Sequence, residues 1–377
     1  MTLYALERQV AISAVTRACA LTSSVFNKLV KSETLTKEDK SPVTIADLSA
    51  QALINTILGT SFPDDPIVGE EDSSDLRGGG EAQRVMRERI TELANDALTK
   101  PLSGEEKKEW GLGDAKSTSE LLDAIDRGNH AGGNKGRMWA VDPIDGTKGF
   151  LRGEQYAVCL ALLVNARVEV GVIGCPNLPL TSTALPSSAL PPTERGAIFV
   201  AVRGQGAESR HLSNAWTSPG TQLRLFSPSG AGILGSGLRF LESVDSGHSA
   251  HDFNERVAKL LGVTNLPNRM DSQAKYCVLA RGLEGEGNVY LRMPVKGKNY
   301  KEKIWDHASG NLLIHEAGGI VSDSYGRPLS FSDGRTFKET TGVVATGSKG
   351  IHEIVIQAIQ KVIELEEAEA KDVTEKL

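Results

Sequence analysis

The sequence predicts a layered α/β protein, and three observations lead to that prediction. The chain has 377 residues, which is too long for one compact core and suits two domains or one large layered domain. Hydrophobic residues make up 40% of it and charged residues 24%, as in ordinary globular proteins. Short apolar runs typical of buried strands alternate with amphipathic helical patterns. We expect an α+β domain over residues 1–220 and an α/β domain over residues 221–377.

The first part of the chain begins with helical patterns. Apolar residues spaced three and four apart predict a helix over residues 3–31 and a second from Ser41 to about residue 58. Further helices are predicted over residues 81–98 and 119–127. Asp47 lies in the first turn of the second helix, where the helix dipole stabilises a carboxylate. Asp47 could therefore be a structural acid or a base held by a rigid helix, and the pattern alone leaves both open.

The most informative stretch is residues 139–150, which read WAVDPIDGTKGF. An apolar run ends at Asp142, and a proline and a glycine then turn the chain out of the strand. Such a turn can aim Asp142, Asp145 and the carbonyl of Ile144 at one point. Hard oxygen ligands of this kind suit Mg²⁺ or Mn²⁺ rather than zinc. Thr147 follows, where a new helix could offer free N–H groups to an anion. An ordinary turn is the alternative.

Two more acidic sites follow the same pattern. Glu70 comes directly after a predicted short strand over residues 67–69, and two further acids follow it. Asp306 lies at the start of a predicted helix that runs to about residue 317 and is closed by two glycines. Rigid elements commonly place ligand groups at such ends in layered α/β folds.

The remaining elements are predicted from apolar runs, turn residues and helical periodicity. We expect strands over residues 155–164, 167–173, 197–202, 288–293, 320–321 and 343–345, helices over residues 251–261, 272–283 and 351–367, and a loop over residues 208–220.

Composition excludes several classes of protein. The net charge is −6 with both signs interspersed, so there is no basic track for a nucleic acid polymer. The four cysteines lie far apart in apolar surroundings and read as buried free thiols of a reducing compartment. We see no apolar run long enough to span a bilayer, and no signal peptide. We expect an intracellular, cytoplasmic monomer.

Three motifs in order carry a resemblance to a known family. They are Gly69-Glu70-Glu71, the segment DPIDGT from Asp142, and the segment WDHASG from Trp305 with EAGG from Glu316. This set resembles the inositol monophosphatase superfamily of Mg²⁺-dependent, lithium-sensitive phosphomonoesterases. Within it the chain is most similar to the eukaryotic 3′(2′),5′-bisphosphate nucleotidases. That closer similarity lies in residues 41–44, 135–137, 149–155, 247–252 and 271–276.

The resemblance implies a layered αβαβα sandwich and a metal site between its halves. It implies two or three Mg²⁺ ions, for which Mn²⁺ could substitute, and it implies that Asp47 and Thr147 activate the attacking water through a hydrogen bond between them. The implied metal ligands are Glu70, Asp142, Asp145, Asp306 and the carbonyl of Ile144. The implied nucleotide contacts are Thr147, His248, Ser272, Lys275, Arg292 and Asp306.

The implied reaction removes the 3′-phosphate of adenosine 3′,5′-bisphosphate, and of its sulfated analogue 3′-phosphoadenosine 5′-phosphosulfate. From the residues alone, Lys275 could instead be a solvated helix lysine, Arg292 could pair with a surface acid, and His248 could simply be exposed. Two other functions stay open: an inositol mono- or polyphosphate 1-phosphatase, and a non-catalytic nucleotide or metal sensor. A sensor would be expected to lose an acid or Thr147, and this chain keeps them all.

Overall fold

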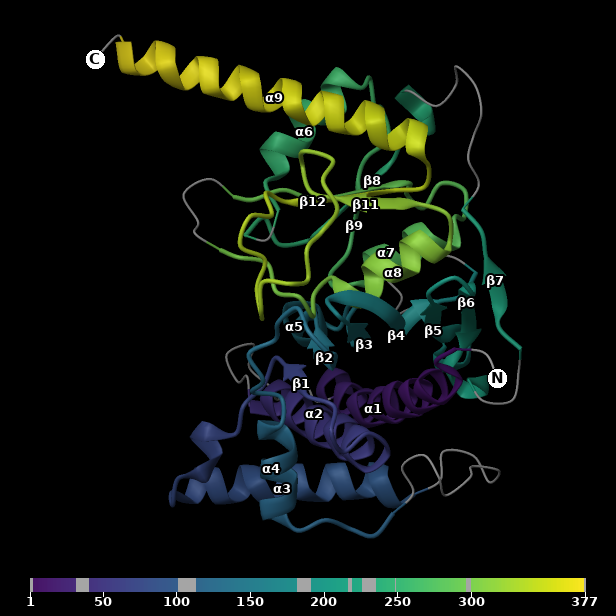
Figure 1. The fold of residues 1–377 in the computed structure, drawn as a ribbon, viewed down its shortest axis with the longest axis vertical. Helices are drawn as coiled ribbons and strands as arrows, with labels where there is room; N and C mark the ends of the chain where they lie inside the picture. Colours follow the sequence, from purple (N-terminus) through teal and green to yellow (C-terminus); the bar gives the residue numbers. More distant parts are fainter. Residues whose placement is uncertain are drawn as a thin grey trace.

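The computed structural model shows five stacked layers, helices–sheet–helices–sheet–helices (Figure 1). It describes residues 3–31, 41–100, 113–181, 191–215, 219–225, 235–247, 249–295 and 300–375. Buried apolar side chains fill the space between neighbouring layers in three clusters. The predicted αβαβα sandwich is therefore confirmed.

The first sheet contains seven strands in chain order, from β1 to β7. β1 runs parallel to β2, and every later pair is antiparallel. β2 and β3 are buried along almost their whole length, as expected for strands covered on both faces. The strands are β1 (Ile67–Gly69), β2 (Arg137–Asp145), β3 (Ala157–Val164), β4 (Arg167–Pro179), β5 (Arg195–Val202), β6 (Gly206–His211) and β7 (Thr221–Leu223).

Helices from the N-terminal part cover the outer face of the first sheet. α1 (Ala5–Lys31) and α2 (Ser41–Ser61) pack against it, and α3 (Glu81–Thr99) and α4 (Thr118–Asp126) lie beyond α2 (Figure 1). The short helix α5 (Thr147–Arg152) follows β2 directly.

The second sheet has five strands in the order β11-β12-β10-β8-β9. Between the sheets lie α7 (Ala274–Arg281) and α8 (Ala308–Glu316), while α6 (His251–Leu260) and α9 (Lys349–Glu375) cover the outer face (Figure 1). The strands are β8 (Phe240–Glu242), β9 (Asn268–Arg269), β10 (Val289–Arg292), β11 (Ile320–Ser322) and β12 (Val343–Thr346), and short 3₁₀ helices lie at Ser74–Arg77, Pro192–Glu194, Leu212–Asn214 and Gly235–Gly237.

Several predicted elements differ from the structure. The predicted loop over residues 208–220 is wrong in its first part, because β6 continues to His211 and pairs with β5. The charged residues of this segment are typical of a loop, so the strand was not predicted. In the structure Glu208 and Arg210 form an ion pair, which allows a polar strand near the edge of the sheet. The helix predicted to contain Asp306 begins only at Ala308. The division at residue 220 remains a prediction.

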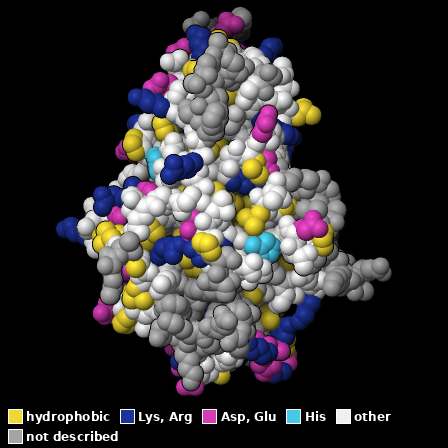
Figure 2. Space-filling view, turned by 90° about the vertical axis from the view of Figure 1, so that its right-hand side faces the viewer, with side chains coloured by type: hydrophobic (Ala, Val, Ile, Leu, Met, Phe, Trp, Pro, Cys, Tyr) yellow, Lys and Arg dark blue, Asp and Glu magenta, His cyan; other side chains and the backbone are white. Residues whose placement is uncertain are grey.

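Helix α1 bears on the expected absence of a membrane segment. Residues 5–28 are long and apolar enough to cross a bilayer by length and composition, which the sequence analysis missed. Most of this helix is buried against α2 and the first sheet, as in the core helix of a globular protein. On the face in Figure 2, acidic and basic side chains are interspersed.

Candidate active site

The parallel pairing of β1 with β2 brings Glu70 beside Asp142. Gly69 is the register partner of Val141, so the next residues along the chain, Glu70 after β1 and Asp142 within β2, lie side by side. The amide of Glu70 donates to the carbonyl of Val141 at 3.2 Å. Two carboxylates 72 positions apart in the sequence are thus neighbours because parallel strands end at the same edge of a sheet.

A bulge in β2 separates Asp142 from Asp145. Asp142 pairs with Cys159 and Asp145 with Ala157, so three steps on β2 oppose two on β3. Pro143 cannot donate to the ladder, which explains why the pairing breaks there. Asp142 is 2% exposed, whereas Asp145 is half-buried at the strand end.

The turn after β2 docks on the start of α7. Asp145 Oδ2 accepts a hydrogen bond from the backbone N–H of Gln273. Gly146 has φ +88°, and a Cβ there would lie 2.9 Å from the Cβ of Ser272, so both conformation and space require glycine. The side chain of Gln273 in turn donates to the carbonyl of Trp305 at 2.7 Å. This chain of contacts links the Asp142–Asp145 turn to the segment that carries Asp306.

Asp306 lies two residues before α8, next to a basic side chain, Arg292, and an acidic one, Glu302. Arg292, on β10, donates to Asp306 Oδ2 at 3.4 Å and to Glu302 Oε1 at 2.9 Å. His307 Nε2 lies 3.0 Å from Glu302 Oε2. Burial alone would raise the pKa of Glu302, but Arg292 and His307 lower it to about 2. Glu302 is therefore a fixed anion that holds Arg292 in place.

The carboxylates at the strand ends act on one another electrostatically. Burial raises the pKa of Asp142 well above its usual value, and the charges of Glu70, Asp145, Asp306 and Asp47 raise it further. Asp47, on α2 and 5% exposed, has its pKa raised by burial and by Glu71 and Glu70. Such a set of like charges is stable only if it is protonated or neutralised by a cation.

The residues present fit a divalent cation at this place. Asp142 Oδ1 and Asp47 Oδ1 are buried and have no hydrogen-bond partner among the described residues. Buried carboxylate oxygens without a partner are costly unless a ligand satisfies them. Among the described residues, the one group of three potential ligand side chains whose ligand atoms all lie within 4.8 Å of one another is a different set, Glu302, Asp306 and His307, but it fits a metal ion less well. Both ring nitrogens of His307 already have partners, Tyr276 and Glu302, and Arg292 neutralises Glu302.

A comparison with models of protein families shows the family of the chain. Residues 5–364 match the model of the inositol monophosphatase family. The chain belongs to the inositol monophosphatase family. The predicted resemblance is therefore confirmed.

Relatives of known name share most of the chain's length. A 3′(2′),5′-bisphosphate nucleotidase of Schizosaccharomyces pombe is 47% identical, covering 93% of this chain and 94% of the relative. Nucleotidases of the same name from Emericella nidulans and Oryza sativa are 47% and 40% identical, covering 96% of this chain each and 99% and 95% of those proteins.

Solved structures show the same fold at low identity. SuhB of Mycobacterium tuberculosis superimposes with a TM-score of 0.55 at 18% identity, covering 96% of this chain and 98% of that one. CysQ of Bacteroides thetaiotaomicron gives 0.54 at 18% identity, covering 92% and 98%. The layered architecture of this family member is therefore shared well beyond its nucleotidase relatives.

Thr147 opens helix α5, as the sequence suggested. The residue is exposed, and its hydroxyl donates to the carbonyl of Ile144 at 3.3 Å. The expected hydrogen bond between Thr147 and Asp47, both described residues, is absent from this structure. The Ile144 carbonyl thus already accepts one hydrogen bond, and its second lone pair is left for another ligand.

The implied nucleotide contacts have different surroundings. Lys275 is 1% exposed, donates to the carbonyl of Met270 at 3.0 Å, and has its pKa lowered to about 8 by burial. A solvated helix lysine is thus excluded.

Arg292 pairs with two acids, Glu302 and Asp306, as in the alternative of an acid-paired arginine, but these side chains are only 11–13% exposed rather than on the open surface. Ser272 is 8% exposed with φ +67°, an unusual backbone for serine. His248 lies outside the described residues.

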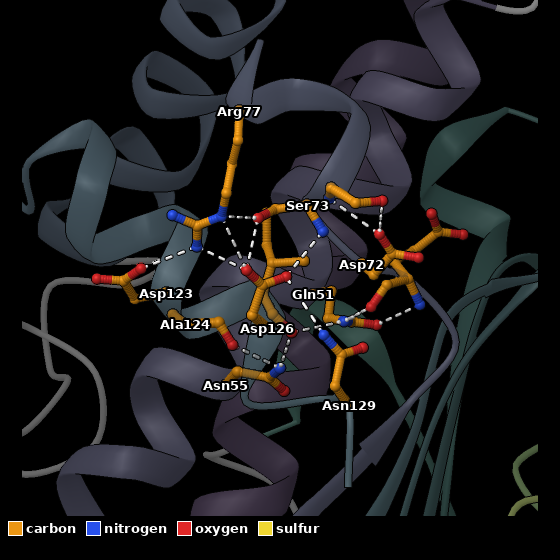
Figure 3. A network of polar contacts seen from close by, with 12 residues as sticks. Gln51, Asn55, Asp72, Ser73, Arg77, Asp123, Ala124, Asp126 and Asn129 are labelled. Carbon is orange, nitrogen blue, oxygen red and sulfur yellow. Dashed lines mark hydrogen bonds and ion pairs between the residues drawn. The ribbon is translucent and has the colours of Figure 1, made fainter.

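Sequence reasoning missed the residues that hold the acidic turn after β1. Gln51, on α2, donates to the carbonyl of Glu71 at 2.6 Å and accepts from the Glu71 N–H at 3.0 Å (Figure 3). Asp126, on α4, accepts from the backbone and side chain of Ser73 at 2.8 and 2.7 Å (Figure 3). Long-range pairs of this kind leave no local pattern in the chain.

Arg335 was also missed. Its guanidinium donates to the carbonyls of Gly128 and His130 at 2.9 and 3.1 Å and to that of Gly69, and it lies 4.7 Å from the ring of Trp305. It therefore ties the end of β1 to the segment before Asp306. Its sequence surroundings, a polar turn, give no indication of this role.

Proposed function

We propose that this member of the family is a Mg²⁺-dependent phosphomonoesterase that removes the 3′-phosphate of adenosine 3′,5′-bisphosphate. The observation that carries the proposal is the buried, unpartnered oxygen of Asp142 among four other carboxylates. The names of the relatives at 40–47% identity support the choice of substrate. The sulfated analogue, which differs at the 5′ end, is the second substrate that we propose.

The proposed metal ligands are Glu70, Asp142, Asp145, Asp306 and the carbonyl of Ile144. Bound divalent cations would supply Lewis acidity at the phosphoryl group and lower the pKa of a nearby water. The protein would contribute by holding these oxygen atoms, which come from the end of β1, from β2 and from one inter-sheet segment, ready for the cations. Its like charges make the site costly without cations and selective for them.

Two residues of the chain are proposed to move the proton of the attacking water. The hydroxyl of Thr147 can accept that proton as it gives up its own, provided a base receives it. Asp47 is the proposed base, because burial and the neighbouring Glu71 and Glu70 raise the pKa of this carboxyl. Release of the Thr147 hydroxyl from the Ile144 carbonyl must accompany this exchange.

The remaining phosphate of a 3′,5′-bisphosphate needs a cationic holder. Lys275 and Arg292 are proposed for it, with Ser272 and the free N–H groups at the start of α5. His248 is proposed as a further contact from the sequence resemblance. Burial raises the pKa of Asp145, and the positive charges of Lys275 and Arg292 oppose that rise, so the two cations partly stabilise the carboxylate in its charged form.

A phosphate-release assay tests the proposed function. The substrates are adenosine 3′,5′-bisphosphate, its sulfated analogue, inositol 1-phosphate and inositol 1,4-bisphosphate, each with Mg²⁺, with EDTA, and with Mg²⁺ plus millimolar LiCl. We expect fast release from the two nucleotides, little from the inositol phosphates, none with EDTA, and inhibition by lithium. Preference for an inositol phosphate would contradict the substrate, and release without a divalent cation would contradict the mechanism.

A further inference from the structure

The acids of the proposed cation site come from different parts of the fold. Glu70 follows β1 of the first sheet, whereas Asp306 lies in the segment before α8, between the two sheets. On one side, Gln273 links these parts, because its N–H donates to Asp145 and its side chain donates to the carbonyl of the residue before Asp306. On the side of Glu70, the link is made by the side chain of Arg335.

The backbone of Arg335 is paired with the segment that leads to Asp306. Residues 335–337 lie antiparallel to residues 302–304, with a β-bridge at the centre of the pair. The N–H of Ile304 donates to the carbonyl of Arg335 at 3.1 Å. Since Asp306 follows two residues after Ile304, this pairing fixes the position of Arg335 relative to that acid.

The side chain of Arg335 binds the end of β1. Its Nη1 donates to the carbonyls of Gly128 and His130 at 2.9 and 3.1 Å, and its Nη2 donates to the carbonyl of Gly69. Gly128 lies beside β1, because its carbonyl also accepts from the N–H of Gly69 at 2.8 Å. One guanidinium thus holds both chain segments at the point where Glu70 begins, and only a planar fork of donors can reach several carbonyls at once.

The charge of Arg335 acts against cation binding. Burial raises the pKa of Glu70, and the positive charges of Lys303 and Arg335 oppose that rise, so both cations act on this carboxylate. Both also lie near the ring of Trp305, Arg335 at 4.7 Å and Lys303 at 5.6 Å from its centroid. A fixed positive charge beside a cation site repels the ion. By charge alone, loss of Arg335 would therefore tighten cation binding.

We propose that Arg335 is a positioning residue that raises the affinity of the site for divalent cations, by holding Glu70 near the Asp306 segment against the effect of its own charge. This inference rests on the proposed function. Residues that fix metal ligands from outside commonly change metal affinity by about 10- to 100-fold. Lys303 has the same charge near the same carboxylate, but within the described part of the chain its ammonium has no hydrogen bond or ion pair, so it cannot hold the site together.

Titration of the metal-free protein with Mn²⁺ tests the proposal, with free Mn²⁺ measured by its electron paramagnetic resonance signal. We expect Arg335→Met and Arg335→Lys both to bind Mn²⁺ about tenfold or more weakly than the wild type. Lysine keeps the charge but lacks the fork, so a loss in both variants separates the holding role from the charge. Lys303→Met is the control for charge, and it should bind Mn²⁺ at least as tightly as the wild type.

A second control accounts for a general loss of stability. Arg137 lies at the opposite end of β2 from Asp145 and donates to Glu7 at 2.9 Å and to Asp65 at 3.0 Å. Arg137→Met should be less stable than the wild type and keep its Mn²⁺ affinity. In phosphate-release assays, Arg335→Lys should need about tenfold more Mg²⁺ for its half-maximal rate and recover near-normal kcat at saturating Mg²⁺.

Thermal melting identifies the variants that are folded, and Arg335→Lys decides alone if Arg335→Met does not fold. Wild-type affinity for Mn²⁺ in folded Arg335→Lys, or tighter binding in folded Arg335→Met, would overturn the proposal. An equal loss of affinity in Arg137→Met would also overturn it, because the effect would then come from stability. If the wild type itself bound no Mn²⁺, the proposed function would fail, and this inference with it.

Discussion

Asp142 shows how a residue that we propose as a metal ligand can oppose folding. Its carboxylate is buried, one oxygen has no partner, and neighbouring acids raise its pKa. An acid whose pKa is higher folded than unfolded destabilises the fold at every pH above its unfolded value, near 4. At neutral pH without metal, Asp142 is therefore a cost to the folded state that a bound cation removes.

Asp142→Asn separates the two effects. Without metal, we expect the free energy of unfolding at pH 7 to rise by about 1 kcal/mol or more, because the buried like charge is gone. With Mg²⁺, we expect turnover to fall about a thousandfold or more. Denaturant melts in EDTA measure the free energy of unfolding, and phosphate-release rates with Mg²⁺ measure the turnover.

Asp65→Asn is the matched control for that variant. Asp65 accepts from Arg137 at 3.0 Å and from the Trp139 indole at 3.0 Å, so its carboxylate is well paired. The Asp65→Asn variant should therefore be less stable than the wild type and keep near-normal turnover. If Asp142→Asn destabilised the metal-free protein as Asp65→Asn does, the like-charge account would fail.

Lys275→Met tests whether the buried ammonium serves the substrate. Methionine keeps the volume of the stem, which lies under the ring of Tyr290 with Nζ 5.5 Å from its centroid. We expect KM for adenosine 3′,5′-bisphosphate to rise about tenfold, and KM for 3′-AMP, which lacks the second phosphate, to change little. Steady-state kinetics with both substrates decide it, with exposed Lys259→Met as control. Equal rises in both KM values would assign Lys275 a structural role.

At the scale of elements, the acidic turn after β1 depends on helix α2. Gln51 is fully buried and uses both ends of its amide on Glu71, while its Nε2 also donates to the carbonyl of Ile125 at 3.1 Å (Figure 3). A Cβ at Gly69 would lie 2.7 Å from Gln51 Oε1, so the end of β1 can approach only because Gly69 is glycine. The position of Glu70 follows from these contacts.

Gln51→Met should disturb both stability and turnover. Three hydrogen bonds to backbone groups are lost, and we expect a loss of about 2–4 kcal/mol in the free energy of unfolding. Turnover should fall more than KM changes, since Glu70 loses its fixed position. The control is Thr56→Val on the same helix, whose hydroxyl bonds only within α2, at 2.7 Å. Normal turnover in folded Gln51→Met would show that Glu70 is positioned by other contacts.

Helix α9 is joined to the second sheet through a buried histidine. His352 lies 2.8 Å from the Ser322 hydroxyl and 3.1 Å from the Thr346 hydroxyl, and burial lowers its pKa to about 4. A histidine with a lowered folded pKa gives its full stabilisation above pH 6.5, and that stabilisation is lost as the pH falls toward 4.

The wild-type protein should lose on the order of 2 kcal/mol through His352 between pH 6.5 and pH 4. His352→Gln should start less stable at pH 7 and lack this part of the acid loss. Denaturant melts across that range measure the difference, with the exposed His130→Gln as control. Parallel pH profiles for wild type and His352→Gln would rule out His352 as the titrating group.

At the scale of the whole molecule, much of the fold follows from local sequence. The period of apolar residues predicts α1 and α2, and the proline and glycines around Asp142 predict the turn where β2 gives way to α5. These signals are local because steric limits and helical period act over a few residues. The approach of Glu70 to Asp142 follows once β1 and β2 are paired in parallel.

The rest is set by contacts between distant residues. β9 has two residues and β7 three, too few for a recognisable period. Arg335 acts on the end of β1, 266 positions away, and the fork of Arg292 between Glu302 and Asp306 depends on how β10 meets the segment before α8. No window along the chain contains both partners of such pairs.

The most direct test of the central claim is the anomalous scattering of crystals grown with Mn²⁺. We predict peaks within about 2.3 Å of carboxylate oxygens of Glu70, Asp142 and Asp145, with Asp142 shared between ions. A peak only at Glu302 and His307, or none near Asp142 at saturating Mn²⁺, would contradict the claim that these strand-end carboxylates form a divalent cation site.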